Sequence, residues 1–290
     1  RIWVPKNRDD CDKDPRQIAE EDRDYYLERI YPSFGNLVPR DIATREIFQV
    51  CLEGHGVQGE NQVYLDLTHI DAETLTRKLG AILEIYEMFV GDDPRHVPMR
   101  IFPGVHYSMG GLGVDFEQRT NIPGLCAAGE CDYSIHGANR LGANSLVSCV
   151  YGGFVAAPSA IDYAKNVERG QTETSSIYDA ELKRQQEIND GIVKNEGGEN
   201  QYKLHDEMGK VMTDNVTVVR YNDRLQATDD KLRELQERFH KISINDSNLW
   251  ATQAVPHARQ LWNMLQLARV ITLGALNRNE SRGAHYKPDF

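Results

Sequence analysis

The sequence changes its pattern twice, and these two changes constrain the fold more than any other feature. Residues 98–165 consist of short apolar segments interrupted by glycine and proline, such as MRIFPGVHYSMGGLGVD and IPGLCAAGE, which is typical of strands joined by tight turns. The residues before and after this stretch repeat apolar side chains mainly at helical spacing. We therefore predict an α+β protein with three regions, residues 1–97, 98–165 and 166–290.

The first region should contain two helices and a strand. Residues 40–53 have one apolar helical face, and residues 61–70 alternate apolar and polar side chains, as a half-buried strand does. Asp71 is suited to cap the N-terminus of the second helix, and Gly91 is suited to end it. Residues 7–24 are densely charged without periodicity, which predicts a solvated loop that leads into a short helix.

The small-residue run at 144–164 predicts a helix whose backbone can approach another flat object closely. In the third region, apolar side chains recur every three to four residues along 232–242, as in an amphipathic helix. Residues 261–276 are apolar on nearly every side, which predicts the buried central helix of an all-α bundle.

Charge and composition exclude some classes of partner. The net charge of −11 argues against nucleic acid or an anionic membrane surface as the main partner. No apolar run approaches the roughly 20 residues that span a bilayer. The five cysteines fit neither a metal-finger spacing nor an even disulfide framework, which favours a reducing compartment. Cys126, Cys131 and His136 lie close in sequence, but at no usual metal-site spacing, so we expect structural roles for them. Since the chain begins with Arg1, in what reads as the second half of a hairpin, we expect it to be part of a longer polypeptide.

The stretch HGANRLGANSLVSCVYGG, residues 136–153, resembles a phosphate-binding loop only in part. Gly137 and Gly142 have the required spacing, but Ala143 stands where the phosphate-binding lysine belongs. Arg140 could instead present its planar guanidinium to a carboxylate, or it could be a surface arginine in a turn. A helix that starts near Ser145 would direct free N–H groups and its positive dipole end back into this loop, which suits a ligand with partial negative charge.

Three further residues are candidates for binding or catalysis. In GLCAAGE, Glu130 follows an apolar segment, where a carboxylate often binds ribose hydroxyls, although the same pattern occurs at many strand ends. In HYSMGG, His106 precedes two glycines that let the backbone pass close to a ring system, although a lone histidine is more often structural. Arg40 follows Pro39 at the start of a predicted helix, where a surface arginine is equally ordinary.

Together, HYSMGG, GLCAAGE, HGANRLGANSL and the closing ESRGAH resemble the flavoprotein subunit of succinate dehydrogenase and fumarate reductase, specifically its C-terminal half. GNLVPRDIATREIF and GDDPRHVPM resemble the subunit of bacterial complexes. The resemblance covers essentially all 290 residues. It implies a capping domain at 1–97, the C-terminal part of a Rossmann-like FAD domain at 98–165, and a helical C-terminal domain at 166–290.

The resemblance also implies roles for the candidate residues. His106 and Arg140 would bind the two ends of a four-carbon dicarboxylate, succinate or fumarate. Arg40 would move the proton while hydride passes between substrate and flavin. For FAD, Glu130 would hold the ribose, and Ser145 with Leu146 would meet the pyrimidine edge; no metal site is implied. The implied partners are an iron–sulfur subunit and, indirectly, a membrane anchor subunit, with the complex peripheral on the cytoplasmic side of the inner membrane.

Two alternatives remain open at the level of sequence. L-Aspartate oxidase is a related family with a similar loop, and it would oxidise an amino-bearing dicarboxylate. The chain could also be a catalytically silent folding unit whose helical domain serves as an interaction surface. The family's N-terminal half carries the glycine loop between a strand and a helix that binds the FAD diphosphate. We expect that loop to lie outside this sequence, so we expect the chain alone neither to hold FAD tightly nor to turn over.

Overall fold

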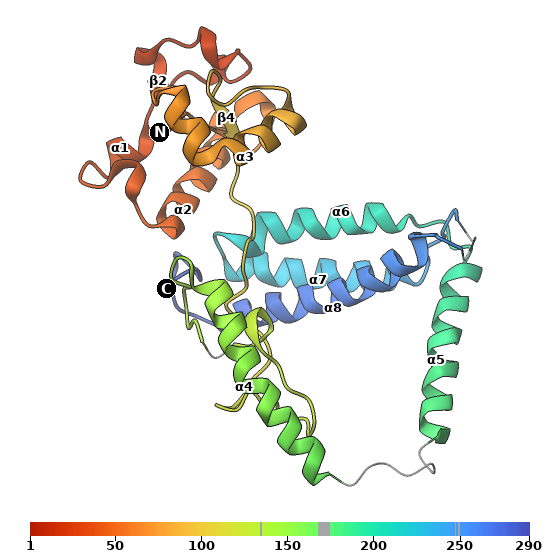
Figure 1. The fold of residues 1–290 in the computed structure, drawn as a ribbon. Coiled ribbons are helices and arrows are strands. Elements are labelled where there is room, and N and C mark those ends of the chain that lie inside the picture. The colour runs from red at the N-terminus through yellow and green to blue at the C-terminus, as the bar shows by residue number, and fades with distance from the viewer. Residues whose placement is uncertain (134, 168–174, 247, 249) are drawn as a thin grey trace. The chain divides into compact units, whose positions relative to one another are not determined.

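The computed structural model describes residues 1–133, 135–167, 175–246, 248 and 250–290. These residues form two units, Arg1–Val105 and His106–Phe290 (Figure 1). The small sheet of the first unit and the helices of both units agree in outline with the predicted α+β class. The predicted limit between the second and third regions, at residue 165, lies within the second unit and stays a prediction.

The first unit contains an antiparallel sheet with strand order β2-β1-β3-β4. Its strands are β1 (Ile2–Pro5), β2 (Arg23–Asp24), β3 (Val63–Leu65) and β4 (Met99–Ile101). The α-helices are α1 (Tyr26–Ile30), α2 (Arg40–Val50) and α3 (Ala72–Val90). Short 3₁₀ or π turns cover Arg8–Asp10, Pro15–Gln17, Glu20–Asp22, Gly35–Leu37, Cys51–His55 and Val57–Gly59.

Strand β3 is buried on both faces, which corrects the predicted half-buried strand. The ring of Tyr64 lies against Trp3, with centroids 4.6 Å apart, and Asp66 Oδ2 accepts a hydrogen bond from Trp3 Nε1 at 3.2 Å. Arg23 pairs with the same carboxylate at 3.3 Å, so the buried charge is compensated. The alternation of apolar and polar residues along 63–67 could not reveal this burial, because Trp3 and Arg23, which contact the second face, lie far from β3 in the sequence.

The predicted helix boundaries in the first unit are confirmed. The Asp71 carboxylate accepts a hydrogen bond from the Thr74 backbone nitrogen at 2.8 Å, as an N-cap does. Gly91 ends α3 with a φ of 86°, which glycine adopts without steric cost. Helix α2 begins at Arg40, directly after Pro39.

In the second unit, the strands predicted between residues 106 and 130 do not form among the described residues. Only isolated bridges occur there, Leu112 with Asp132 and Arg119 with Cys126, followed by a 3₁₀ turn at Gly129–Cys131. A strand needs a neighbour along its length to satisfy its backbone groups, and these bridges do not extend into ladders. The prediction of a strand through GLCAAGE is therefore wrong for this structure.

Helix α4 (Asn144–Asn166) confirms the predicted small-residue helix. It packs against the 3₁₀ turn at Gly129–Cys131 and buries Ser148, Gly152 and Ser159. A Cβ on Gly152 would lie 3.2 Å from the backbone nitrogen of Gly129, so a small residue permits this close approach. By length and composition α4 could also cross a bilayer, which corrects the expectation that no segment is long and apolar enough; helices packed within a protein meet the same criterion.

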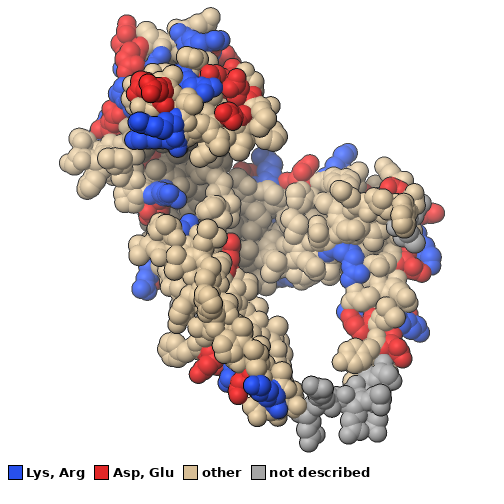
Figure 2. Space-filling view, in the orientation of Figure 1, with Lys and Arg blue, Asp and Glu red and all other residues tan. Residues whose placement is uncertain are grey.

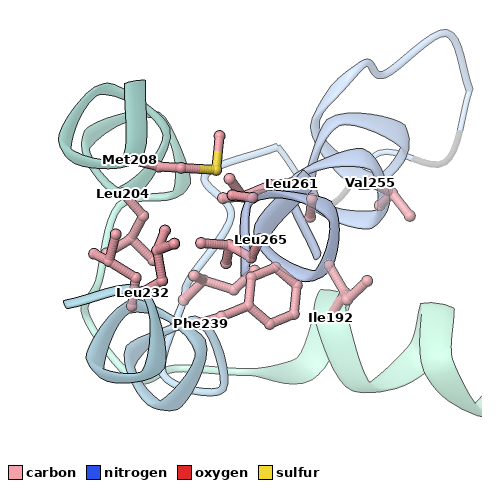
Figure 3. Packing of buried hydrophobic residues seen from close by; sticks show 12 residues of the cluster. Ile192, Leu204, Met208, Leu232, Phe239, Val255, Leu261 and Leu265 are labelled. Atoms are coloured by element: carbon pink, nitrogen blue, oxygen red, sulfur yellow. The ribbon is translucent and has the colours of Figure 1, made fainter. Parts of the chain in front are cut away.

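The rest of the second unit is helical: α5 (Ser175–Lys194), α6 (Gln201–Met212), a π turn (Thr213–Thr217), α7 (Asn222–Phe239) and α8 (Ala254–Asn277). Helices α6, α7 and α8 lie side by side (Figure 1). Their buried core includes Leu204, Met208, Leu232, Leu261 and Leu265, and α5 adds Ile192 (Figure 3). The amphipathic pattern predicted at 232–242 is confirmed, since its apolar residues belong to this core.

Helix α8 fits its prediction on one side only. Leu261 and Leu265 are fully buried, whereas Leu267, Val270 and Ile271 are 61%, 66% and 52% exposed. The prediction of a helix buried on every side is wrong for the described residues, because α6 and α7 cover one face of α8 and leave the other uncovered.

Candidate active site

The loop before α4 ends in an uncapped helix N-terminus. Ala143 is the N-cap residue, with φ at 63°, and it has no side-chain group that could accept a hydrogen bond from the first turn. Ser145 and Leu146 are the second and third residues of α4, so their N–H groups belong to the turn that lacks intrahelical partners. The free N–H groups and the helix dipole together create a positive potential in front of the loop.

Arg140 lies in this loop, two residues before Gly142. Its guanidinium carbon lies 4.9 Å from the centre of the Tyr107 ring, and its Nη1 donates a hydrogen bond to Leu141 O at 3.0 Å. Its Nε is buried and has no hydrogen-bond partner among the described residues. A guanidinium that is held on an aromatic ring, with donors still unpaired, is suited to bind a carboxylate.

Tyr107 also joins a hydrogen-bonded group with His136 and Ser148. Its hydroxyl lies 3.2 Å from His136 Nε2, and His136 Nε2 lies 3.1 Å from Ser148 Oγ. Ser148 Oγ donates to Ser145 O at 2.7 Å, so the group is anchored on the first turn of α4. The expected structural role of His136 stays a prediction. Among the described residues, no group of three or more His, Cys, Asp or Glu could hold a metal ion.

Sequence reasoning missed Tyr107 and Ser148. The available signal for Tyr107 was its place inside the quoted HYSMGG motif, directly after His106. The sequence showed Ser148 only as one of several small residues in the run at 144–164. Its hydrogen-bond partners Tyr107 and His136 lie in two other segments, so the spacing could not predict them. The structure shows that both contact residues that the motifs had singled out.

Glu130 connects two of the quoted motifs. Its Oε1 accepts a hydrogen bond from the Ser108 backbone nitrogen at 2.9 Å, which links GLCAAGE to HYSMGG. The backbone nitrogen of Leu112 donates to Cys131 O at 2.7 Å beside it. A Cβ on Gly111 would lie 2.2 Å from Cys131 O, so only glycine permits this approach.

A hollow of about 450 Å³ lies between the loop and α4. Its size is within the range of small-molecule sites, roughly 300–1,000 Å³. The residues that line it are Ile135, His136, Asn139, Leu141, Asn144, Val147, Ser148 and Tyr151. Leu146 and Phe154 are exposed apolar residues of α4 that lie close in sequence to the residues lining the hollow. Figure 2 shows α4 almost free of charge except toward its C-terminal end.

The second unit therefore brings together most of the predicted site residues. Arg140 and Glu130 each contact the HYSMGG segment, which begins with the exposed His106, while Ser145 and Leu146 begin α4. Arg40 is exposed at the start of α2, in the first unit. The assigned roles of these residues remain predictions.

Comparisons with known proteins first define the class. The model of an FAD binding domain matches residues 19–146, and the model described as fumarate reductase flavoprotein C-term matches residues 205–290. These matches define the class as flavoproteins.

More specifically, the chain belongs to the family of succinate dehydrogenase and fumarate reductase flavoprotein subunits. It is 62% identical to the succinate dehydrogenase flavoprotein subunit of Bacillus subtilis over 92% of this chain and 46% of that protein. It is 35% identical to the fumarate reductase flavoprotein subunit of Escherichia coli over 88% of this chain and 42% of that protein. The chain thus spans about half the length of the curated relatives it matches.

Solved structures agree. A quinol-fumarate reductase with menaquinol molecules matches with a TM-score of 0.85 and 32% identity, covering 99% of this chain and 49% of that chain. Mycobacterium smegmatis Sdh1 in complex with UQ1 matches with a TM-score of 0.76 and 29% identity, covering 99% of this chain and 45% of that chain.

Proposed function

We propose that the chain supplies substrate and flavin contacts in a flavoprotein subunit that interconverts succinate and fumarate. The observation that carries this proposal is Arg140. Its guanidinium lies over Tyr107, its buried Nε has no hydrogen-bond partner in the part of the chain that the structure describes, and it lies shortly before an uncapped helix N-terminus. A carboxylate receptor placed next to a site for partial negative charge is the combination that a dicarboxylate oxidoreductase needs.

The residues present fit FAD. The uncapped first turn of α4 offers backbone N–H groups to a ring edge that carries negative charge, and these belong to Ser145 and Leu146. The exposed apolar side chains of α4 would cover an aromatic ring system and exclude water. Glu130 would accept hydrogen bonds from the ribose. FAD bound there would supply the hydride acceptor or donor of the reaction.

For the substrate, Arg140 and His106 would hold the two carboxylates of succinate or fumarate. Fixed donors at both ends orient the central carbons and stabilise charge that develops on one carboxylate as the double bond changes. Arg40 would transfer the proton. Arg40, whose guanidinium carries only N–H donors, would donate the proton during fumarate reduction.

The same proposal includes the partners. The solved structures that match are a quinol-fumarate reductase with menaquinol molecules and Mycobacterium smegmatis Sdh1 in complex with UQ1. We therefore place the subunit with an iron–sulfur subunit and, through it, a membrane anchor subunit, peripheral on the cytoplasmic side of the inner membrane. From the net charge of −11, the proposal includes no nucleic acid among the partners.

The test uses the complete flavoprotein subunit, in which FAD content and succinate-dependent dye reduction are measured for Arg40→Lys. We expect the variant to retain FAD and to lose turnover by about 10²–10⁴-fold, the range of general acid–base catalysis. Arg45→Lys is the matched control, since Arg45 lies on the same helix and pairs with Asp41 at 3.5 Å. Parental turnover in Arg40→Lys would exclude the proton-transfer role.

The two alternatives have distinct outcomes. If aspartate reduces the dye and succinate does not, the subunit is an L-aspartate oxidase instead. If FAD does not bind even when the N-terminal half is supplied, the chain is a catalytically silent folding or interaction unit. The self-contained core of α6, α7 and α8 is the feature that would serve such a unit.

A further inference from the structure

The closing motif ESRGAH lies in a short C-terminal hairpin, residues 278–287, which packs against the loop that carries Arg140. The Ala284 backbone nitrogen donates a hydrogen bond to Ala138 O at 3.1 Å. Gly283 also packs against this carbonyl, because a Cβ added to it would lie 2.3 Å from the same oxygen. Ala138 precedes Arg140 by two residues, so the hairpin holds the backbone immediately before the arginine.

The hairpin is closed by its own hydrogen bonds. Ser281 Oγ donates to Lys287 O at 2.7 Å and accepts from the Lys287 backbone nitrogen at 2.9 Å. Inside this closure, Arg282 and His285 form an antiparallel bridge, with Arg282 N donating to His285 O at 2.8 Å. The turn that carries Gly283 and Ala284 is therefore fixed on both sides.

Buried basic side chains attach the hairpin to the helical bundle. Lys287 is buried, and its Nζ donates to Leu276 O at the end of α8 and to Asn279 Oδ1, each at 3.0 Å. His285 is also buried; its Nδ1 faces Arg220 Nη1, and its Nε2 lies 2.9 Å from Arg278 O. Burial lowers the pKa of His285, which agrees with a neutral ring that accepts from Arg220 and donates to the carbonyl.

The Arg140 loop needs such support from outside. It is bounded by Gly137, with φ at 57°, and by Gly142, so its own backbone is permissive at both ends. Arg140 nevertheless has to present its guanidinium at a defined place, because an error of about 1 Å in positioning can cost about 10²-fold in rate. A rigid element packed on Ala138 O supplies the constraint that the glycines do not.

The geometry points to the C-terminal hairpin as a positioning element for the substrate arginine, with Gly283 as its contact residue. This inference rests on the proposed function of Arg140 as a carboxylate ligand. The hairpin transmits the rigid placement of α7 and α8 to the loop through the buried Lys287 and His285, and Gly283 and Ala284 fix the Ala138 carbonyl. None of these residues needs to touch the substrate.

The test compares Gly283→Ala with Gly198→Ala in the complete, FAD-loaded subunit. Both glycines have positive φ, 59° and 83°, so both substitutions impose backbone strain, but Gly198 has nothing within 4 Å of its added Cβ. We expect Gly283→Ala to raise the KM for succinate about tenfold or more while FAD content stays parental, consistent with a displaced ligand arginine. Gly198→Ala should leave KM unchanged. A parental KM in Gly283→Ala, or an equal rise in both variants, overturns the inference.

A milder variant keeps the inference testable if Gly283→Ala fails to fold. Ser281→Ala removes both hydrogen bonds that close the hairpin and should raise KM in the same direction, whereas Ser281→Thr keeps the hydroxyl and should restore it. Arg140→Lys is measured in parallel. If it keeps the parental KM, the assignment of Arg140 fails and this inference fails with it. If Arg140→Lys raises KM while Gly283→Ala and Ser281→Ala do not, only the positioning role of the hairpin is wrong.

Discussion

Helix α4 and the bundle of α6, α7 and α8 are both rich in apolar residues, yet they place them differently. The bundle buries Leu204, Leu232, Leu261 and Leu265 against one another (Figure 3), while the uncovered face of α8 leaves Leu267 exposed. Helix α4 buries only small residues on one face and exposes large ones, with Leu146 and Phe154 each 76% exposed. We infer that the exposed apolar face of α4 binds a ligand or another part of the complete subunit, whereas the buried leucines of the bundle stabilise the fold.

The largest expected effect tests the bundle side of this comparison. Leu261→Ala should lower the free energy of opening of the bundle by about 3 kcal/mol, because it removes a fully buried side chain and leaves a cavity. Leu146→Ala on α4 should change stability by less than about 0.5 kcal/mol but weaken FAD binding. Hydrogen exchange across both helices in the complete subunit measures the opening, and equal destabilisation by the two variants would contradict the comparison.

A buried ion pair also belongs to the bundle. Asp229 is fully buried and pairs with Arg269 at 2.8 Å and Arg233 at 2.7 Å. Burial opposes ionisation, but these two partners outweigh it and hold the pKa of Asp229 below its ordinary value. Asp229→Ala should therefore destabilise α7 and α8 by about 2 kcal/mol, since the partly buried guanidinium of Arg269 loses its carboxylate and, among the described residues, keeps only the bond to Gln236.

The control for that prediction is Glu181→Ala on α5, which breaks an exposed pair with Arg184. Exposed pairs contribute little because water and salt screen them, so no measurable change is expected. If both variants have the same effect on hydrogen exchange, Asp229 has no special structural role in the bundle.

A smaller effect concerns the start of α4. Ala143 adopts a φ of 63°, a conformation that costs an L-residue about 1 kcal/mol. Ala143→Gly removes this strain but raises the conformational entropy of the unfolded chain, so the net stabilisation of α4 should be about 0.5 kcal/mol. Ala160→Gly, within the same helix, should destabilise it by about 1 kcal/mol. Opposite signs in the hydrogen exchange of α4 are the expected result, and a destabilising Ala143→Gly would show that the N-cap conformation is unstrained.

The smallest effect is a pH dependence of the C-terminal hairpin. Because burial lowers the pKa of His285, the unfolded chain binds the proton more readily than the folded one. The contribution of neutral His285 to the stability of the hairpin should be complete above the ordinary histidine pKa of about 6.5. It should decline as the pH falls below that value. Hydrogen exchange of residues 278–287 at different pH values measures this decline, and His285→Gln should reduce it; an unchanged profile in the variant would assign the effect elsewhere.

Local sequence signals predicted some elements well. Asp71 and Gly91 set the ends of α3 because capping and left-handed conformation depend on the residue itself. The small residues of 144–164 and the apolar spacing at 232–242 likewise predicted α4 and α7, since helical periodicity is a local property. The motifs around His106, Glu130, Arg140 and Ser145 named the family, and the comparisons confirmed it.

Tertiary structure decided what depends on partners distant in sequence. Asp66 is buried because Trp3 and Arg23 approach it from other strands, and GLCAAGE is not a strand because its isolated bridges do not extend along it. Sequence named Arg140 as a carboxylate ligand but gave no sign that Tyr107 lies under it or that Gly283 packs beside Ala138. Residue type and spacing determine what a side chain can do and which local structure it favours; the packing of segments that are far apart in the chain determines which neighbours hold it in place.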